Sequence, residues 1–396
     1  MQFLVSAGEA SGDLYASGVV NHLRRLLPEA VYYGCAGPRL KQAGVEPVVD
    51  AADISVVGLA EVVSHLPRIY GEYRRLVRYA RQNTPGAALL TDNPDFNLRV
   101  ARQLKRLGVP IFYLVAPQVW AWRQGRVKTI RQLVDKLFCL FPFEESWFRE
   151  RGVEATYIGH PLTSLVHPQF TRSEFLFRHR LPRGSALITL LPGSRPGEIA
   201  RHVPILLETI ASLRARLDIS VVLATPKGFQ TAPVLSKFRE RMAALSIQVI
   251  ENETWDCIAH ANVALAASGT VTIEAAVLGT PLVTFDKVNP LSWHAGRRLV
   301  KAPFLSMVNL IAQEQVVPEL IQNEMTPAKL TDAVSELLTS GARVQCMRAD
   351  LARVRHLLTT SHDPLAHTAH VIAERMQVES NLAPPSERDL VRETIN

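Results

Sequence analysis

Two acids and two amides crowd a short loop, and they could do acid–base chemistry. The loop spans residues 91–97 (TDNPDFN) and follows directly on a strand-like run that starts at Ala87. Ligands of open α/β sheets bind at the carboxyl ends of strands, so a carboxylate here could remove the proton from an attacking sugar hydroxyl. Asp92 and Asp95 are both candidates for this base. An Asx turn that caps the following helix explains the same residues, and the pattern leaves that alternative open.

A Ser-Gly-Thr turn in the second half of the chain could hold a diphosphate. Ser268, Gly269 and Thr270 stand between a strand-like run and a helical pattern. Hydroxyl groups and the free N–H groups of a helix N-terminus suit phosphate oxygens. Glu274 follows about one turn into the helix, where a carboxylate could accept both hydroxyls of a ribose. An ordinary capped helix start with a surface glutamate remains the alternative.

Each half of the chain opens with a strand-like run and a loop of small residues. The first loop spans residues 6–13 (SAGEASGD) and the second spans residues 192–198 (PGSRPGE). Small residues let a backbone approach a phosphate or a sugar closely. Arg195 in the second loop could clamp a diphosphate and stabilise it as a leaving group without a metal ion. Two such halves suggest a cleft between domains, where two substrates are held against each other.

Aromatic and basic side chains share a further loop. The segment 116–126 (APQVWAWRQGR) combines two tryptophans with two arginines, among them Trp122 and Arg123. It suits an anionic, amphipathic ligand, although a packed aromatic pair with snorkelling arginines explains it equally well. His160 also ends a strand-like run, where a lone histidine is more often a structural or substrate hydrogen-bonding group than a catalyst.

The elements that must position these loops alternate between strands and helices, which is typical of a parallel sheet covered by helices on both faces. Strands are predicted at residues 2–7, 30–35, 87–91, 110–115, 137–140 and 155–158, and then at 186–191, 219–224, 247–250, 262–266 and 281–285. Helices are predicted at 14–27, 96–107, 198–216, 230–245, 270–278 and 327–338, with two more within 343–376 and a polar tail from 377.

Length and composition favour two domains with separate cores, since the chain has 396 residues, of which 47% are hydrophobic and 20% charged. We place the linker in the charged segment 167–185. The predicted domains are 1–166, 167–342 and a C-terminal part, 343–396. No secretory signal and no run of roughly 18 apolar residues is visible, so we expect a cytoplasmic protein. Four widely spaced cysteines argue against disulfides and a zinc site.

The net charge of +7 is concentrated in one region, because residues 60–131 carry +9 and the rest of the chain carries −2. Such a region suits nucleic acid, anionic lipid or a phosphorylated substrate, or is simply a set of solvated helix faces. An apolar stripe at helical spacing lies within it, surrounded by arginines. This amphipathic helix fits either an anionic membrane or ordinary packing on a sheet. The stripe consists of Ile69, Tyr73, Leu76, Val77 and Ala80.

Taken together, the motifs resemble those of one family, the lipid-A-disaccharide synthases, which are GT-B-fold glycosyltransferases. Each block is weak by itself, but the ordered set, spread over about residues 3 to 330, is specific. Two departures from the usual family pattern, Asn93 and Pro161-Leu162, remove no candidate catalytic group. The blocks are 7–13 (AGEASGD), 57–62 (VGLAEV), 92–97 (DNPDFN), 119–124 (VWAWRQ), 141–144 (FPFE), 159–160 (GH), 190–195 (LLPGSR), 267–270 (ASGT), Glu274, 298–301 (RLVK) and 309–310 (NL).

The resemblance implies an α/β fold of GT-B type, with two Rossmann-like domains facing a cleft and C-terminal helices that return to the N-terminal domain. The implied reaction is inverting and metal-independent. UDP-2,3-diacylglucosamine and 2,3-diacylglucosamine 1-phosphate give the β-1,6-linked disaccharide 1-phosphate and UDP. No cofactor is expected. Acceptor and membrane contacts would belong to the N-terminal domain, and the UDP-sugar to the second domain.

The same resemblance assigns roles residue by residue. Asp92 corresponds to the base for the acceptor 6-hydroxyl, with Asp95 as its competitor. Arg195 matches the essential arginine of the family on the UDP side. The substrate-binding residues expected from the blocks are Glu9, Ser11, Trp122, Arg123, His160, Ser194, Ser268, Gly269, Thr270, Glu274 and Asn309.

Partners and location follow from the implied substrates. Both carry acyl chains and the acceptor carries a phosphate, which favours membrane contact by the region Val56–Gln82. The resemblance places the protein on the cytoplasmic face of the bacterial inner membrane. It also suggests a homodimer formed through the C-terminal segment, and gives no reason to expect nucleic acid as a partner.

Two other readings stay open. A UDP-N-acetylglucosamine 2-epimerase shares the two-domain fold and a Ser-Gly loop with a nearby glutamate, but it leaves the basic amphipathic stretch unexplained. A non-catalytic nucleotide- or lipid-binding protein has no use for a base such as Asp92. An NAD dehydrogenase is disfavoured because no Gly-x-Gly-x-x-Gly follows either opening strand.

Overall fold

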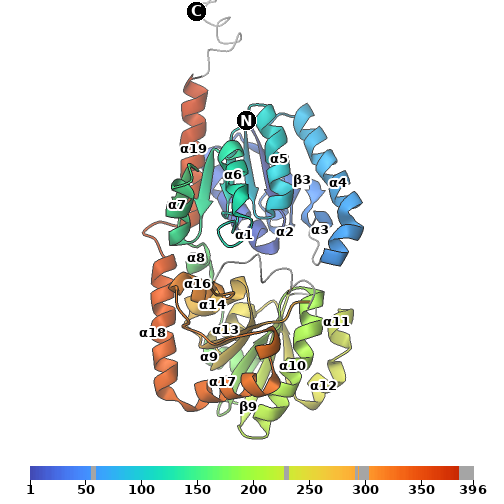
Figure 1. Ribbon diagram of the computed structural model, residues 1–396, viewed down its shortest axis with the longest axis vertical. Coiled ribbons are helices and arrows are strands. Elements are labelled where there is room, and N and C mark those ends of the chain that lie inside the picture. The colour runs from blue at the N-terminus through green and yellow to red at the C-terminus, as the bar shows by residue number, and fades with distance from the viewer. Residues whose placement is uncertain (55–58, 227–231, 290–292, 294–302, 383–396) are drawn as a thin grey trace, which may run out of the picture. The chain divides into compact units, whose positions relative to one another are not determined.

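The computed structural model describes residues 1–54, 59–226, 232–289, 293 and 303–382 (Figure 1). The chain divides into two compact units. Unit 1 comprises Met1–Pro161 and the segment from Thr360 onward, and unit 2 comprises Leu162–Thr359. Of the sequence blocks named above, residues 57–58 and 298–301 lie outside the described residues, as does the tail beyond residue 382.

The unit boundaries differ from the predicted ones at both ends of unit 2. The short helix α8 (Leu162–Leu165) packs against α14 (Thr270–Leu278), so unit 2 begins before residue 167. Helix α18 (Gly341–Leu358) also packs against α14, and against its neighbours in unit 2. Its apolar side covers the second core rather than the first, because Met347, Leu351 and Val354 are fully buried there.

Unit 1 contains a seven-stranded parallel sheet with the order β3-β2-β1-β4-β5-β6-β7. The strand order reverses between β1 and β4, so the loops that leave these two strands lie side by side at the carboxyl edge. The buried strands are nearly continuous apolar runs, as expected when helices cover both faces. The strands are β1 (Gln2–Ala7), β2 (Val31–Ala36), β3 (Glu46–Asp50), β4 (Ala87–Thr91), β5 (Ile111–Leu114), β6 (Lys136–Cys139) and β7 (Ala155–Tyr157).

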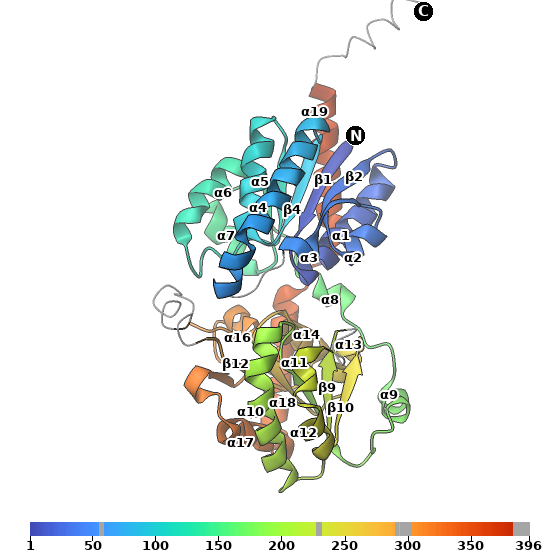
Figure 2. The same cartoon turned by 90° about the vertical axis from the view of Figure 1, so that its right-hand side faces the viewer.

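Helices cover both faces of this sheet, with α4, α5 and α6 on one side and α1 on the other (Figure 2). The C-terminal helix α19 returns to lie along α1, as the resemblance implied. The approach is close, since a Cβ at Gly18 would lie 2.4 Å from Leu365 Cδ1. The helices are α1 (Ala10–Leu26), α2 (Pro38–Gln42), α3 (Ala51–Ile54), α4 (Leu59–Gln82), α5 (Pro94–Arg106), α6 (Val127–Leu133), α7 (Pro142–Arg149) and α19 (Pro364–Leu382), with a 3-10 turn η1 (Gln124–Arg126).

The apolar stripe of α4 faces the core of unit 1. Leu76 and Ala80 are buried in that core, and Ile69 and Tyr73 pack against its edge. Ordinary packing on the sheet is therefore the right interpretation of this stripe. Any membrane contact by α4 must use its other side, where the arginines project.

Unit 2 contains a six-stranded parallel sheet with the order β10-β9-β8-β11-β12-β13. Here the order reverses between β8 and β11, so the loops after these strands are neighbours. The strands are β8 (Ala186–Leu191), β9 (Ile219–Thr225), β10 (Ile247–Glu251), β11 (Val263–Ala267), β12 (Leu282–Asp286) and β13 (Glu319–Ile321).

The helices of unit 2 include α9 (Arg172–Arg178), α10 (Pro196–Arg214), α13 (Thr254–Ala259), α16 (Met307–Ala312) and α17 (Pro327–Thr339), with a 3-10 turn η2 (Gln322–Glu324). The single helix predicted over 230–245 is wrong. Two short helices, α11 (Pro233–Ser236) and α12 (Arg239–Ala244), take its place. Among all described helices, none is long and apolar enough to cross a membrane.

Candidate active site

Asp92 lies just past the carboxyl end of β4, against the N-terminus of α1. Its Oδ1 accepts a hydrogen bond from the Gly8 backbone N–H at 2.7 Å, and its Oδ2 accepts one from the Glu9 N–H at 3.1 Å. Two motifs more than 80 positions apart in the chain therefore meet where the strand order of unit 1 reverses. The helix N-terminus places partial positive charge beside this carboxylate.

The small residues of the first loop make room for the Asp92 carboxylate. A Cβ at Gly12 would lie 1.7 Å from Asp92 Oδ2, and a Cβ at Gly8 would lie 2.7 Å from Asn93 Cβ. We expected this loop to admit a phosphate or a sugar. Instead, the two amide N–H groups that it presents at the helix start are bonded to Asp92.

A network beneath Asp92 holds its backbone in an unusual conformation. The φ angle of Asp92 is 52° and that of Asn93 is 32°, both in the left-handed region. Asn97 Nδ2 donates to the Asp92 carbonyl at 3.1 Å, and Tyr113 Oη donates to the same oxygen. Ser6 Oγ in turn donates to Asn97 Oδ1 at 2.7 Å. Left-handed residues persist only where their surroundings over-determine them, so this network fixes the direction of the carboxylate.

Sequence reasoning included Ser6 only as the first residue of the loop 6–13, without a role of its own, and it missed Tyr113. The signal for Ser6 was a hydroxyl inside an otherwise apolar strand. Tyr113 gave none, because tyrosine is an ordinary strand residue.

The two acids of the loop have different surroundings. Burial raises the pKa of the Asp92 carboxyl well above its usual range, and the negative charges of Glu9 and Asp13 add to this, while the two amide hydrogen bonds oppose it. Asp95 is exposed and forms ion pairs with Arg126 and, at 3.5 Å, with Arg123. Asp92 therefore fits the role of a proton acceptor, and Asp95 that of an anchor for the arginines of the next loop.

Within the Trp-Ala-Trp-Arg loop, the two tryptophans have separate roles. Trp120 Nε1 donates to Glu144 Oε1 at 3.0 Å, and Glu144 Oε2 accepts from the Leu140 and Phe141 N–H groups. Glu144 is buried, and burial raises its pKa to about 7. Trp122 is 40% exposed and stacks with the Arg123 guanidinium, 4.4 Å from the ring centroid. Glu144, which the sequence analysis named only as the end of the block 141–144 and gave no role, thus anchors the loop that presents Trp122 and Arg123.

His160 is buried between aromatic rings. Tyr15 meets it edge-on at 5.9 Å and Phe141 lies 6.0 Å away. Burial lowers its pKa to about 3, so the ring is neutral at physiological pH. Glu9 and Ser11, the remaining expected residues of this unit, lie at the start of α1, with Glu9 exposed.

In unit 2, Arg195 stands at the N-cap of α10, just after β8. Its Nη1 lies 3.2 Å from Glu198 Oε1 one turn further on, and Ser194 beside it is exposed. Gly193 has a φ of 107°, and a Cβ there would lie 2.4 Å from Glu198 Oε2. The loop can therefore turn tightly enough to bring Arg195 to the edge of the sheet only with glycine at this position.

The Ser-Gly-Thr turn follows β11, the neighbour of β8. Ser268 Oγ donates to the Leu305 carbonyl at 2.8 Å, and its hydroxyl oxygen retains acceptor capacity. Gly269 is the N-cap of α14 with a φ of 149°, and Thr270 is exposed at the first helical position. The loops of Arg195 and Ser268 thus flank the point where the strand order of unit 2 reverses.

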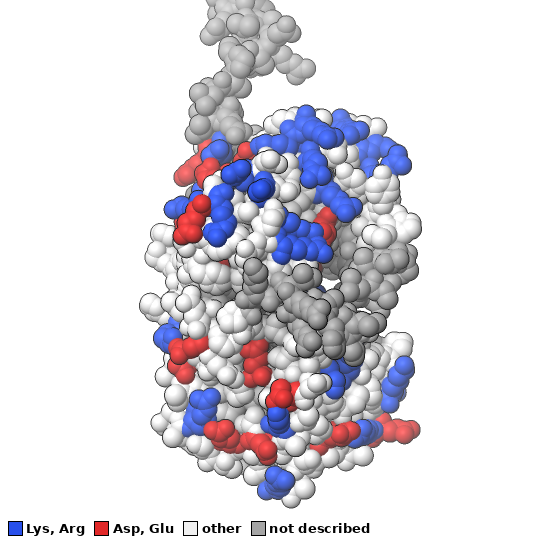
Figure 3. Space-filling view, in the orientation of Figure 1, with Lys and Arg blue, Asp and Glu red and all other residues white. Residues whose placement is uncertain are grey.

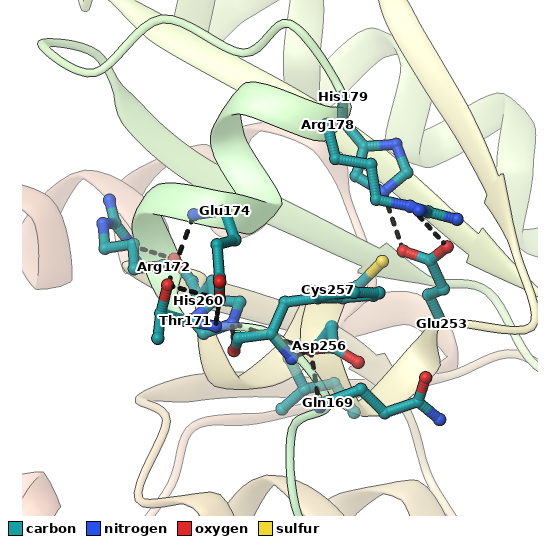
Figure 4. Close-up of polar contacts among 12 residues, drawn as sticks. Gln169, Thr171, Arg172, Glu174, Arg178, His179, Glu253, Asp256, Cys257 and His260 are labelled. Atoms are coloured by element: carbon teal, nitrogen blue, oxygen red, sulfur yellow. Dashed lines mark hydrogen bonds and ion pairs between the residues drawn. The ribbon is translucent and has the colours of Figure 1, made fainter.

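Glu274 lies one turn into α14 and receives a hydrogen bond from the Trp255 side chain. Burial raises the pKa of Glu274 to about 7, and the Trp255 bond opposes that shift. Trp255 belongs to α13, and its neighbour Asp256 bonds that helix to the segment before α9 (Figure 4). There, Asp256 Oδ1 accepts the N–H groups of Gln169 and Phe170, each at 2.9 Å.

Asn309 is buried and its side-chain amide is fully occupied. Nδ2 donates to the Val317 carbonyl and to Glu319 Oε2, and Oδ1 accepts from the Val316 and Val317 N–H groups. Glu319 Oε1 in turn accepts the Leu305 N–H at 2.5 Å. We expected Asn309 near UDP as a binding residue; its amide instead braces the segment that contacts Ser268.

The described parts of both units contain no cluster of three or more His, Cys, Asp or Glu side chains placed to hold a metal ion.

Two Rossmann-like units, each with its loops gathered at the switch point of a parallel sheet, give the chain a fold of GT-B type. Solved structures with this fold include the UDP-GlcNAc 2-epimerase of Neisseria meningitidis bound to UDP-GlcNAc, with a TM-score of 0.62, 12% identity and coverage of 95% of this chain and 100% of that one. The calicheamicin glycosyltransferase CalG4 has a TM-score of 0.58, 17% identity and coverage of 94% and 97%.

Comparison with protein sequences identifies the family more specifically than the solved structures do. The model of the lipid-A-disaccharide synthetase family matches residues 3–372. The lipid-A-disaccharide synthase of Solibacter usitatus is 56% identical over 357 residues, which cover 90% of this chain and 93% of that protein. That of Koribacter versatilis is 40% identical over 361 residues, covering 90% and 93%. The chain belongs to the lipid-A-disaccharide synthase family, and it is a glycosyltransferase of lipid A biosynthesis.

Proposed function

We propose that this protein condenses UDP-2,3-diacylglucosamine with 2,3-diacylglucosamine 1-phosphate. The products are the β-1,6-linked disaccharide 1-phosphate and UDP. The acceptor 6-hydroxyl oxygen forms a bond to the anomeric carbon of the donor, and the bond from that carbon to the diphosphate breaks. The hydroxyl proton passes to the protein, and the anomeric centre is inverted.

The observation that carries the proposal is the Asp92 carboxylate, braced at the switch point of unit 1. Two backbone amides and a left-handed backbone fix its direction. Its raised pKa makes it a stronger proton acceptor than an exposed carboxylate, once it is ionised. Asp92 therefore serves as the base for the acceptor hydroxyl, and unit 1 is assigned the acceptor.

The donor is assigned to unit 2. Glu274 accepts hydrogen bonds from the ribose hydroxyls, while Ser268, Gly269 and Thr270 serve the diphosphate. Arg195 supplies the positive charge that stabilises UDP as it leaves, in the place that a metal ion takes in other transferases. Ser194 adds a hydroxyl beside it. On this assignment the reaction needs neither a metal ion nor a cofactor.

The proposed substrates imply contact with a lipid surface on the cytoplasmic side of the inner membrane. Lys and Arg side chains gather over unit 1 on the face drawn in Figure 3. On α4, Leu66 and Tyr70 are 48% and 56% exposed, and Arg74 lies over the Tyr70 ring. Apolar side chains next to arginines suit the interface of an anionic bilayer. A homodimer through the C-terminal segment stays a prediction, for which light scattering is the test.

The test is acceptor-dependent release of UDP. Purified protein is given UDP-2,3-diacylglucosamine in detergent and EDTA, with and without 2,3-diacylglucosamine 1-phosphate, and the lipid product is analysed by mass spectrometry. UDP released only with acceptor, together with a disaccharide 1-phosphate, supports the proposal. Conversion of UDP-N-acetylglucosamine to its 2-epimer, with no disaccharide from the acylated pair, would replace it with the epimerase alternative.

A further inference from the structure

His202 is a fully buried histidine that no role described so far uses. It lies in the second turn of α10, the helix that Arg195 caps. Its Nδ1 is 2.8 Å from the Pro192 carbonyl oxygen, and its Nε2 is 3.0 Å from the Lys287 backbone nitrogen. Both ring nitrogens therefore contact main-chain groups of loops outside α10.

These two partners determine the tautomer of the ring. The Pro192 carbonyl can only accept, so Nδ1 must carry the proton. The Lys287 N–H can only donate, so Nε2 must present its lone pair. His202 is therefore the neutral Nδ1–H imidazole. The Asp286 carboxylate, with Oδ1 3.5 Å from Nε2, and the Phe285 ring, which meets the imidazole edge-on, complete its surroundings.

The two loops joined by His202 follow the strands next to the proposed diphosphate turn. Pro192 follows β8 and Lys287 follows β12, and these strands flank β11, from which the Ser268 turn emerges. Arg201 adds a second bond to the same place, since its Nε donates to the Lys287 carbonyl at 2.7 Å. The Lys287 residue is thus held at its N–H by His202 and at its carbonyl by Arg201.

We propose that His202 is a positioning residue that sets Arg195 for the donor diphosphate, by tying the Pro192 carbonyl to the Lys287 amide through its Nδ1–H tautomer. Arg195 is three residues beyond Pro192, and the intervening Gly193 gives the loop backbone freedom that the bond to Pro192 restrains. The inference rests on the proposed function, because it takes Arg195 to be the diphosphate ligand.

A double-mutant cycle with UDP affinity as its readout tests this role without depending on turnover. Isothermal titration measures the UDP Kd of wild type, His202→Phe, Arg195→Ala and the double variant. A misplaced Arg195 should weaken binding about 100-fold in His202→Phe. In the Arg195→Ala background, His202→Phe should weaken UDP binding less than about 3-fold, because the residue that His202 positions is gone. Equal losses in both backgrounds would mean that His202 only packs the core, and would overturn the proposal.

Two conservative variants separate the two bonds. The amide nitrogen of Asn in His202→Asn can still donate to Pro192, whereas the amide oxygen of Gln in His202→Gln can accept from Lys287. If the Pro192 bond positions Arg195, His202→Asn should retain at least about tenfold more UDP affinity than His202→Gln. The reverse order would contradict the assignment. Thr209→Val, on the same helix and equally buried, is the matched control and should leave the Kd unchanged.

The tautomer itself is checked by spectroscopy on the wild-type protein. Long-range ¹H–¹⁵N correlation spectra, with the His202 signals assigned by their loss in His202→Asn, should show a protonated Nδ1 and an unprotonated Nε2 at neutral pH. An Nε2–H tautomer or an imidazolium would overturn the proposal even if the transferase activity is found. A correct tautomer without any UDP binding would instead point to failure of the proposed function.

Discussion

The Asp92 carboxylate occupies the space that a side chain at Gly12 would need, since a Cβ at Gly12 would lie 1.7 Å from Asp92 Oδ2. The glycine in the first turn of α1 and the acid after β4 therefore form one unit. Changing Gly12 to Ala should push the carboxylate off the Gly8 and Glu9 amides and lower kcat about 100-fold, because displacement by about 1 Å has effects of that size. Kinetics of UDP release measure it.

Gly71 is the matched control for this change. It also lies within a helix, α4, but a Cβ there meets nothing within 4 Å. Gly71→Ala should keep wild-type kcat and raise stability by about 0.5 to 1 kcal/mol, the usual gain in a helix interior. If Gly12→Ala were as active as Gly71→Ala, the fixed position of Asp92 would have no bearing on turnover.

UDP affinity should depend on pH through Glu274. Its pKa of about 7 means that the carboxylate is largely protonated at pH 6 and ionised at pH 8, and the ionised form is the better acceptor for ribose hydroxyls. Affinity should therefore rise several-fold from pH 6 to pH 8, as titration calorimetry would show. Trp255→Phe removes a hydrogen bond that favours the ionised form, so the rise should move to higher pH. A Glu274→Gln variant with the same pH profile as wild type would contradict this.

Buried Glu144 should make part of the stability depend on pH. Its pKa is raised from 4.5 to about 7 in the folded protein, so between these values the folded state binds more protons than the unfolded state. Stability from this group is full below pH 4.5 and is lost as pH rises through 7. Relative to Glu144→Gln, the free energy of unfolding of wild type should fall by about 3 kcal/mol as the pH rises from 4.5 through 7. Urea unfolding at several pH values measures the difference, and a constant difference would refute the linkage.

Membrane binding should depend on the exposed side of α4. Replacing Leu66 and Tyr70 with Ser should weaken binding to phosphatidylglycerol liposomes at least about tenfold in sedimentation assays, as should Arg74→Glu with Arg78→Glu. Phe177→Ser is the control, because Phe177 is 82% exposed but lies in unit 2. Unchanged binding by both double variants would exclude α4 as the contact.

The sequence was most informative where strands are central and least informative at the edges of the sheets. The predicted bounds of β1, β4 and β8 are those observed, because each is an apolar run ended by a polar loop. Strands β3 and β13 were missed. Both are edge strands with few or no buried side chains, so their pairing is visible only once the sheet exists.

For the site, the sequence indicated the loops but not the contacts within them. Asp92 and Arg195 stand out as charged residues at strand ends. Three contacts are consequences of long-range packing. The loop 6–13 bonds Asp92, Glu144 bonds Trp120, and Asn309 braces its own segment internally. No local pattern carries such information, because the partners are brought together by the sheet.

The central claim is that Asp92 is the base, and replacement of that one carboxylate tests it most directly. Asp92→Asn should lower kcat about 1000-fold while changing the UDP Kd less than about 3-fold, and Asp95→Asn should stay within tenfold of wild type. Because the pKa of Asp92 is raised and the base must be ionised, wild-type kcat should rise with pH. Acceptor-dependent UDP release in EDTA, measured for all three proteins from pH 5 to 9, gives both results. An Asp92→Asn enzyme within tenfold of wild type would contradict the account.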